Sequence, residues 1–411
     1  MDARALAALA ANPGCRRRAL LDGAGVDKGA LAQALGAPAN FGQSQFAHQR
    51  GNSFEARVKA DGGADLVRLL HERLRDGTEP PGPGAVATPD LTAPGPQGRT
   101  ARTVLALREA TEAGRWALLD HPMVSLDVAG SPAFLEPDAV VVHPDGSWTV
   151  VEIKSFPMVD GSADPAKVGA AARQSAVYAL ALERVASMIG EPPEDGDDAT
   201  MTPSAAGPAN TAGAAGTADP AGATALEGPA ASAGPAPARG RVRHQVLLVC
   251  PKDFSNLPTA EMVDVRKQLA VTRRQLDRLT RIEEIAAALP EGTTFDLRLT
   301  DDGRTPTRPL EELTAAVDAV DAAYAPECLS ACELAAHCRT RSRGAGLVEA
   351  LGRGVRGELG GLTTVDAVLT AAMERPADDA PTGDPAVDAL RRAAALRAEA
   401  LASRPEAVPC R

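Results

Sequence analysis

Two short segments rich in β-branched residues, joined by a turn sequence, most restrict the folds open to this chain. They span 137–142 and 148–154, and the His-Pro-Asp-Gly-Ser between them contains an Asp-Gly turn signal. We predict two neighbouring strands, paired as a hairpin. Because side chains alternate across a strand, Glu152 and Lys154 share one face. Asp138 opens the first strand near the same end, so we expect two carboxylates and a lysine to converge at the rim of an apolar sheet.

This combination of side chains suits a divalent metal site. Mg²⁺ takes oxygen ligands, commonly one or two protein carboxylates together with a substrate phosphate. The bound ion lowers the pKa of a water and polarises the phosphoryl oxygen. Lys154 would orient that water or offset the charge that develops on the phosphate. The alternative is a surface Glu–Lys pair on an exposed strand face.

With these residues, the sequence resembles the PD-(D/E)XK nucleases, in their RecB-like branch that includes the CRISPR-adaptation exonucleases and the AddB nuclease domain. In that branch, a helix after the Glu-x-Lys strand carries Gln-x-x-x-Tyr, which Gln174 and Tyr178 match here. Asp164 and Pro165 are suited to begin this helix, and residues four apart share a helix face. The resemblance implies that Gln174 contacts substrate near the metal, and that Tyr178 stacks on or hydrogen-bonds a nucleic acid strand. The alternative is an amphipathic helix whose tyrosine packs in the core.

Residues 49–58 resemble the helix that carries the first acidic residue of this branch. The resemblance makes Glu55 a further metal ligand, or a residue that orients one. Asn52 followed three residues later by Glu55 also fits a capping box, so a helix start is the alternative interpretation. His48 directly precedes the segment and is a weaker candidate ligand.

The cysteines supply a second signal. Cys15 lies near the N-terminus, and Cys328, Cys332 and Cys338 form a triplet. We find no signal peptide or transmembrane run, which favours metal binding over a disulfide framework. The nuclease relatives often place one cysteine before the core and three after it around a [4Fe–4S] cluster, which implies that these four thiolates hold one. The triplet departs from the commonest family spacing, which has two residues rather than three between its first two members.

Two other interpretations of the cysteines remain open. His337 could complete a Cys3His zinc site with the triplet. The three cysteines could also be incidental in a helical tail. Cys250 ends an apolar run and is expected to be a buried core thiol. Cys410, the penultimate residue, is expected to be unstructured.

Charge excludes one class of protein and suggests local contacts. The chain has 411 residues and a net charge of −11, which argues against a uniformly basic DNA-coating protein. Basic residues nevertheless gather in three places, where they are either phosphate contacts or solvated faces. These are Arg266, Lys267, Arg273, Arg274, Arg278 and Arg281 on one helical stretch, Arg16, Arg17 and Arg18 beside the first cysteine, and Arg339, Arg341 and Arg343 beside the last.

The predicted organisation is an α/β, restriction-endonuclease-like core, a central mixed sheet flanked by helices, with helical terminal segments and disordered insertions. The expected parts are 1–75, helical with the first cluster cysteine; 76–100, a flexible insertion; 101–189, the catalytic core, beginning with a helix near 101–114; 190–240, a disordered Ala/Gly/Pro linker; 241–340, the rest of the core and the cysteine triplet; and 341–411, a helical tail. The tail is either a plain helical appendage or a set of helix-hairpin-helix elements that grip a DNA backbone.

The resemblance implies metal-dependent phosphodiester hydrolysis on DNA, most naturally exonucleolytic on single strands or ends. Asp138 and Glu152 would bind Mg²⁺ or Mn²⁺, with Glu55 assisting and the Ile153 carbonyl contributing. We expect a cytoplasmic protein with no membrane partner. No Gly-x4-Gly-Lys-Ser/Thr loop occurs, so unwinding would need a helicase or another defence or repair protein. Two alternatives remain: a catalytically inactive iron–sulfur or zinc module that binds nucleic acid, and a zinc-stapled interaction protein whose acidic linker recruits partners.

Overall fold

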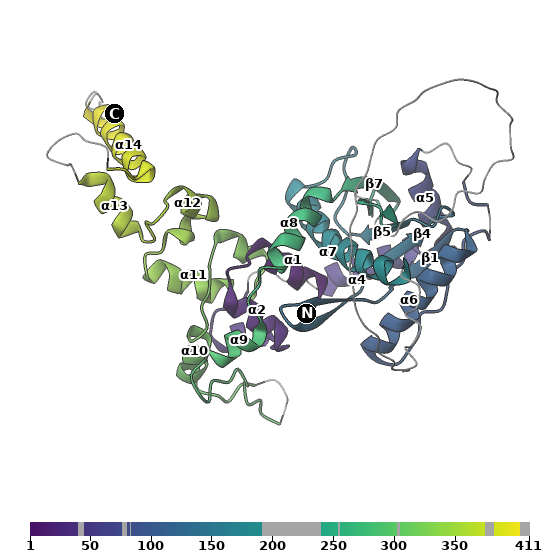
Figure 1. Cartoon of the computed structure of the whole chain (residues 1–411), viewed down its shortest axis with the longest axis horizontal. Coiled ribbons are helices and arrows are strands. Elements are labelled where there is room, and N and C mark those ends of the chain that lie inside the picture. Colours follow the sequence, from purple (N-terminus) through teal and green to yellow (C-terminus); the bar gives the residue numbers. More distant parts are fainter. Residues whose placement is uncertain are drawn as a thin grey trace, which may run out of the picture.

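The predicted hairpin lies at the centre of a mixed sheet (Figure 1). The computed structural model describes residues 1–39, 45–75, 80–82, 84–190, 240–253, 255–301, 305–374 and 382–402. Within these residues, five strands form one sheet in the order β1-β4-β5-β6-β7, and β2 and β3 form a separate antiparallel pair. The strands are Ala117–Asp120 (β1), Val124–Val128 (β2), Ser131–Leu135 (β3), Ala139–Val142 (β4), Trp148–Ile153 (β5), Gln245–Pro251 (β6) and Pro258–Asp264 (β7). β5 and β6 are parallel and the other neighbours in the large sheet are antiparallel, so the sheet is mixed, as expected.

The turn between β4 and β5 forms for the reason that the sequence suggested. Asp145 accepts hydrogen bonds from the Ser147 backbone N–H at 2.9 Å and from the Ser147 hydroxyl at 2.6 Å. Gly146 has a φ of +78°, a left-handed conformation that glycine adopts without a steric penalty. Every residue of β4 and β5 is buried, because both strands have a neighbour on each side and helices above and below.

Helices cover both faces of the sheet, and each face has its own apolar cluster. Alternate strand residues such as Val140 and Val150 pack with α1, α6, α7 and α8, whereas Val141 and Val151 pack with α4 and α5. The helices are Ala3–Ala11 (α1), Arg16–Gly23 (α2), Lys28–Ala34 (α3), Gln45–Val58 (α4), Ala60–Gly63 (η1), Ala64–Leu74 (α5), Gly95–Ala113 (α6), Pro165–Gly190 (α7), Arg266–Leu276 (α8), Ile282–Ala287 (α9), Leu310–Asp318 (α10), Pro326–Ser330 (η3), Ala335–Gly344 (α11), Val348–Leu351 (η4), Arg353–Glu358 (α12), Val365–Met373 (α13) and Pro385–Ala402 (α14). The architecture is therefore α/β, with a mixed sheet flanked by helices.

The helix that follows β5 starts where the sequence indicated. Asp164 accepts a 2.8 Å hydrogen bond from the Ala166 backbone N–H, and Pro165 is the first residue of α7. The helix lies between β5 and β6 in the chain, so it is part of the crossover that a parallel pair requires.

Two helix boundaries differ from the prediction. α6 begins at Gly95, inside the segment expected to be a flexible insertion, because Pro96 sits in its first turn, where a proline is tolerated. The basic helix α8 ends at Leu276, so Arg278 and Arg281 lie beyond it. Arg266 pairs with Asp264 and Arg273 pairs with Glu183, so these two arginines already have carboxylate partners.

The N-terminal helices and the segment that follows α10 meet beside the sheet. The backbone N–H of Arg17 in α2 donates a 2.8 Å hydrogen bond to the carbonyl of Asp321, and Asn12 Nδ2 donates to the carbonyl of Ala323 at 2.6 Å. An apolar cluster that includes Leu21, Leu31 and Leu313 fills the junction between α2, α3 and α10. The contact holds the N-terminal helices against the segment that carries the cysteine triplet.

The C-terminal tail is helical, as predicted, and α13 and α14 lie far from the sheet (Figure 1). The predicted linker at 190–240 falls almost entirely outside the described residues, as does Cys410. Among the described residues, no helix combines the length and apolar character needed to cross a membrane.

Candidate metal and nucleic-acid site

Asp138 and Glu152 face each other across the β4–β5 pair. The register pairs Ala139 with Val151, and continuing it by one residue places Asp138 opposite Glu152. The Ile153 backbone N–H donates a 2.6 Å hydrogen bond to Oδ2 of Asp138, which fixes this carboxylate against the end of β5. By alternation, both residues lie on the sheet face that α7 covers. The structure therefore brings together the two carboxylates that the sequence predicted.

Glu152 is a buried carboxylate with few partners. Its exposed fraction is 0%, which contradicts the interpretation as a pair on an exposed strand face. Lys154 Nζ forms an ion pair with Oε1, whereas Oε2 receives no hydrogen bond from any described residue. Burial raises the pKa of Glu152 to about 7, with Lys154 opposing the rise and Asp138 adding to it. The site thus holds more negative charge than its donors compensate.

The same imbalance affects the neighbours of Glu152. Burial raises the pKa of Asp138, and Lys154 opposes this rise without cancelling it. For Lys154, burial acts to lower the pKa, but the charges of Glu152 and Asp138 outweigh burial and raise it. Lys154 therefore remains an ammonium group, held between two carboxylates.

Glu55 approaches this pair from α4. Asn52 lies within α4 rather than at its start, so the capping-box interpretation is wrong. Glu55 is half-buried and bonds through Oε1 to Lys59 Nζ at 2.5 Å and to His121 Nε2 at 3.0 Å. The hydrogen bond from His121, followed by that from Lys59, lowers the pKa of Glu55 to about 2 despite burial. The negative charge of Glu55 also contributes to the raised pKa of both Asp138 and Glu152, which places it in the same electrostatic site.

Lys59 and His121 are site residues that the sequence did not reveal. Lys59 also pairs with Asp120 at 2.6 Å, and the backbone N–H of His121 donates to the carbonyl of Asp138 at 3.3 Å. His121 has a φ of +45°, an uncommon conformation for a residue other than glycine. That strain is detectable only in the structure. His48, the weaker candidate, lies in α4, but its side chain is outside the described part of the molecule.

Gln174 and Tyr178 lie on one face of α7, as predicted, but they differ in exposure. Gln174 Nε2 donates a 3.0 Å hydrogen bond to the Tyr178 hydroxyl, which donates to the Glu136 carbonyl at 3.1 Å. Tyr178 is only 4% exposed, so its ring packs in the core and cannot stack on a strand. Its hydroxyl instead fixes the side chain of Gln174, which is partly exposed. The stacking role expected for Tyr178 is therefore wrong.

Cys15, Cys328 and Cys332 line one cavity, and Cys338 accepts a hydrogen bond from Arg17, two residues after Cys15. Burial raises the pKa of Cys332 to about 12; Arg18 opposes the rise, and the thiols of Cys338 and Cys15 add to it. Burial likewise raises the pKa of Cys338, with Cys15 and Cys328 among the neighbours that contribute. Each of the four cysteines thus affects, or has, a pKa that a neighbouring cysteine raises. Cys250 is fully buried on β6, which confirms its assignment as a core thiol.

Hydrogen-bond donors point at two of these sulfurs. Arg17 donates to Cys338 Sγ at 3.2 Å and to the Val320 carbonyl at 3.0 Å, and Asn12 Nδ2 lies 3.6 Å from Cys328 Sγ. Arg17 is 6% exposed, so it serves this junction and not a solvated phosphate-binding face. His337 Nε2 lies 3.0 Å from Asp318 Oδ1, so Nδ1 is the ring nitrogen through which His337 could bind a metal in a Cys3His site.

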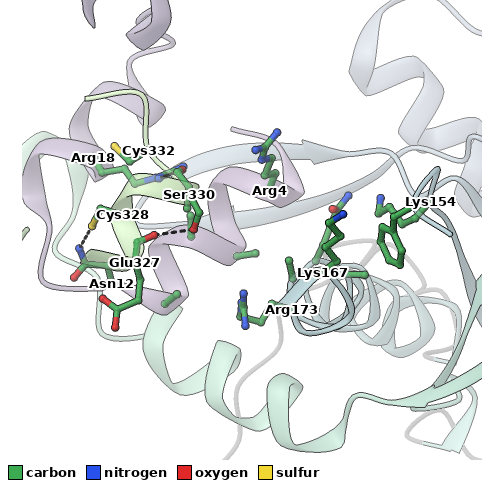
Figure 2. A pocket seen from close by; sticks show the side chains of 18 of the residues that line it. Arg4, Asn12, Arg18, Lys154, Lys167, Arg173, Glu327, Cys328, Ser330 and Cys332 are labelled. Atoms are coloured by element: carbon green, nitrogen blue, oxygen red, sulfur yellow. Dashed lines mark hydrogen bonds between the residues drawn. The ribbon is translucent and has the colours of Figure 1, made fainter. Parts of the chain in front are cut away.

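A cavity extends from the cysteine region to Lys154 (Figure 2). It has a volume of about 830 Å³, and its lining includes Cys15, Cys328 and Cys332 at one end and Lys154 and Gln174 at the other. Within the described residues, no three His, Cys, Asp or Glu side chains are arranged closely enough to enclose a metal ion in this conformation.

Comparison with protein-family models, with curated proteins and with solved structures found no match for this chain.

Proposed function

We propose that this protein hydrolyses phosphodiester bonds in DNA, using Mg²⁺ or Mn²⁺ held by Asp138 and Glu152. The observation that carries the proposal is the pairing of these carboxylates across β4 and β5, with Lys154 directly beside them. The resemblance to the RecB-like branch of the PD-(D/E)XK nucleases, and with it a restriction-endonuclease-like core, is part of this proposal.

The residues present fit a hard divalent cation. Oε2 of Glu152 is buried and receives no hydrogen bond from the described residues, and a buried carboxylate oxygen in that state carries a large desolvation cost. Burial raises the pKa of both carboxylates despite the opposing charge of Lys154, so a bound cation would stabilise their ionised forms. Mg²⁺ and Mn²⁺ prefer carboxylate and carbonyl oxygens, so Asp138, Glu152 and the carbonyl of Ile153 are suitable ligands. A bound ion would supply an activated water and polarise the phosphate.

Other residues would position the substrate and the water. Lys154 lines the cavity, where its ammonium group can hydrogen-bond the attacking water or a phosphate oxygen. Gln174, fixed by Tyr178, lines the same cavity and can hold the strand near the reacting phosphate. Glu55 would act as a further metal ligand if its Oε1 gave up its present bonds to Lys59 and His121.

We further propose that Cys15, Cys328, Cys332 and Cys338 hold a [4Fe–4S] cluster. The observation that favours it is that Cys15, Cys328 and Cys332 line one cavity while Arg17 and Asn12 donate to the sulfurs of Cys338 and Cys328. The metal content of the purified protein separates this cluster from a Cys3His zinc site, in which His337 would coordinate through Nδ1 while Nε2 bonds to Asp318. The cluster would join the N-terminal helices to the segment around α11.

The experiment compares the wild type with Lys154→Ala and with Lys252→Ala, a control that removes an exposed lysine outside the site. Each protein is purified without oxygen, its visible spectrum and metal content are recorded, and Mg²⁺-dependent cleavage of labelled single-stranded DNA is measured. We expect a brown wild type that cleaves, a brown Lys154→Ala that does not, and a Lys252→Ala protein like the wild type.

Other outcomes separate the alternatives. Equal cleavage by the wild type and Lys154→Ala would indicate a contaminating nuclease and remove the catalytic proposal. Tight, salt-sensitive strand binding without cleavage by the wild type would favour an inactive binding module. A colourless protein that contains zinc would overturn the iron–sulfur proposal and leave the nuclease proposal intact.

A further inference from the structure

Lys59 is a second lysine beside the proposed metal site, and its ammonium group bridges two carboxylates. Nζ lies 2.5 Å from Oε1 of Glu55 and 2.6 Å from Oδ1 of Asp120. Nε2 of His121 lies 3.0 Å from Nζ and 3.0 Å from the same Oε1. The Lys59 side chain is only 10% exposed, so these groups compensate its charge more than water does.

The turn after Lys59 fixes this arrangement. Residues 61–63 have φ values of +57°, +67° and +76°, a run of left-handed conformations. Gly63 packs so closely on β1 that a Cβ in its place would lie 1.9 Å from Cδ2 of Leu118. Such backbone conformations persist only where the surrounding structure holds them. The end of α4 is therefore held against β1, whose last residue is Asp120.

Lys59 and its partners lie next to the proposed metal ligands. The register of β1 and β4 pairs Asp120 with Ala139, the residue that follows Asp138. The backbone N–H of His121 also donates to the Asp138 carbonyl at 3.3 Å. An ammonium group beside a bound divalent ion repels it, and this repulsion is stronger where water is scarce. The charge of Lys59 therefore opposes metal binding at Asp138.

Lys59 also restricts the use of Glu55 as a ligand. A carboxylate oxygen offers about two lone-pair sites. Two nitrogens already lie within 3.0 Å of Oε1 of Glu55, one from Lys59 and one from His121. A metal ion can bind this oxygen only if one of the two nitrogens leaves it.

We infer that Lys59 competes with the divalent ion for Glu55, and so sets the metal concentration at which the site fills. The inference rests on the proposed function and adds a residue that regulates the same site. Lys59 is a positioning residue, because it acts on the ion through Glu55 and through its own charge. Removal of the ammonium group frees Oε1 and removes the repulsion, so metal binding tightens.

The test measures Mn²⁺ binding by calorimetric titration. The full-length protein is purified without oxygen, dialysed against EDTA and then returned to EDTA-free buffer. We expect Lys59→Met to bind Mn²⁺ about tenfold more tightly than the wild type. Lys252→Met removes the same charge from an exposed position after β6, so this control should bind like the wild type. Equal or weaker binding by Lys59→Met would overturn the inference, as would an equal gain in both variants.

A double-mutant cycle tests whether Lys59 acts through Glu55. Glu55→Gln keeps an oxygen that accepts from Lys59 but replaces an anionic ligand with a neutral one. Combined with Lys59→Met, it should remove most of the gain in Mn²⁺ affinity. A gain that persists in full in the double variant would show that Lys59 acts by charge alone and would overturn the competition for Glu55.

Glu55→Gln on its own gives a result that does not depend on the folding of Lys59→Met. It should weaken Mn²⁺ binding less than Asp138→Asn does, because Lys59 already holds the Glu55 oxygen. A loss as large as that of Asp138→Asn would mean that Glu55 is a ligand while Lys59 is in place, and the inference would be wrong.

Cleavage of single-stranded DNA in Mg²⁺ is measured separately. Mn²⁺ affinities that follow the expected pattern in a wild type that does not cleave would refute the nuclease proposal and keep the role of Lys59. Cleavage by the wild type, with an Mn²⁺ affinity that Lys59→Met leaves unchanged, would do the reverse. No Mn²⁺ binding by the wild type or any variant would refute both.

Discussion

The backbone N–H of Ile153 donates a 2.6 Å hydrogen bond to Oδ2 of Asp138, linking the start of β4 to the end of β5. This bond engages one carboxylate oxygen through the main chain and does not involve Oδ1. The position of Asp138 therefore depends on strand pairing, and its charge can change without loss of the bond.

Asp138→Asn tests this separation of position from charge. The amide oxygen can still accept from Ile153, so we expect a melting temperature close to that of the wild type. Metal binding should suffer, because a neutral amide oxygen replaces an anionic ligand, and we expect cleavage to fall on the order of 100-fold or more. Calorimetric titration with Mn²⁺ and a cleavage assay measure the two effects. A variant that keeps full Mn²⁺ affinity would exclude Asp138 as a ligand.

The raised pKa of Glu152 predicts that metal-free protein loses stability as the pH rises. Burial raises the pKa in the folded state to about 7 from the ordinary 4.5. Between these two pH values the folded protein therefore holds a proton on Glu152 that the unfolded chain does not. The stability of the fold that depends on this protonated carboxyl is fully present below pH 4.5 and is lost as the pH rises through about 7. The slope approaches about 1.4 kcal/mol per pH unit for one proton.

Glu152→Gln should flatten that dependence. We expect urea unfolding in EDTA, measured at intervals from pH 5 to 8, to show a smaller loss of stability in the variant than in the wild type. His121 also has a raised pKa, through its hydrogen bond with Glu55, so it adds a loss of stability above pH 6.5, but it is present in both proteins. Identical slopes for the two proteins would mean that Glu152 is ionised throughout.

The cysteine site can be tested with two buried thiols in different surroundings. Cys338→Ser should lose iron and the broad visible absorption on anaerobic purification, because a proposed cluster ligand is missing. Cys250→Ala removes a thiol from β6 and should retain both signals with only a small loss of stability. Iron content and visible spectra are the measurements. Retention of the full iron content by Cys338→Ser would contradict the proposed ligand set.

Arg17 and Arg16 are neighbours whose replacement should have unequal effects. Arg17 is buried and bonds to the Val320 carbonyl and to Cys338, so Arg17→Ala should lower the free energy of unfolding by about 3 kcal/mol. Arg16 forms an exposed pair with Asp321 at 3.6 Å, so Arg16→Ala should cost no more than about 1 kcal/mol. Urea unfolding followed by circular dichroism compares them. Similar losses would show that burial at this junction matters less than the contacts suggest.

The central hairpin could be predicted because its signals are local. The β-branched runs and the Asp-Gly turn are contiguous, and they correctly indicated β4 and β5. β1 escaped prediction because four residues, Ala117–Asp120, are too few to distinguish a strand from a buried helical segment. β3 contains Pro132 and β7 begins with Pro258, and proline weakens a strand prediction unless the strand lies at an edge.

The candidate site could be predicted only where its residues form a short motif. Asp138, Glu152 and Lys154 come from one hairpin, and the structure brings them together. Lys59 and His121 are 62 positions apart and meet only because α4 packs beside the end of β1. The error over Tyr178 has a different origin, because helical spacing shows which side chains share a face but not whether that face is buried.

Because Cys15 and the cysteine triplet lie far apart in the sequence, the contacts between their two segments form late in synthesis. Cys338 follows Cys15 by 323 positions in the chain. Because ribosomes add about 5–20 residues per second, Cys338 is synthesised roughly 16 to 65 s after Cys15. During that interval the first cysteine and the α2 helix lack the carbonyls of Val320 and Asp321 that Arg17 binds in the finished protein. The contacts of the N-terminal helices with this segment therefore form late in synthesis, and a cluster that uses all four thiols can be inserted only after the strand residues up to Asp264 have been made.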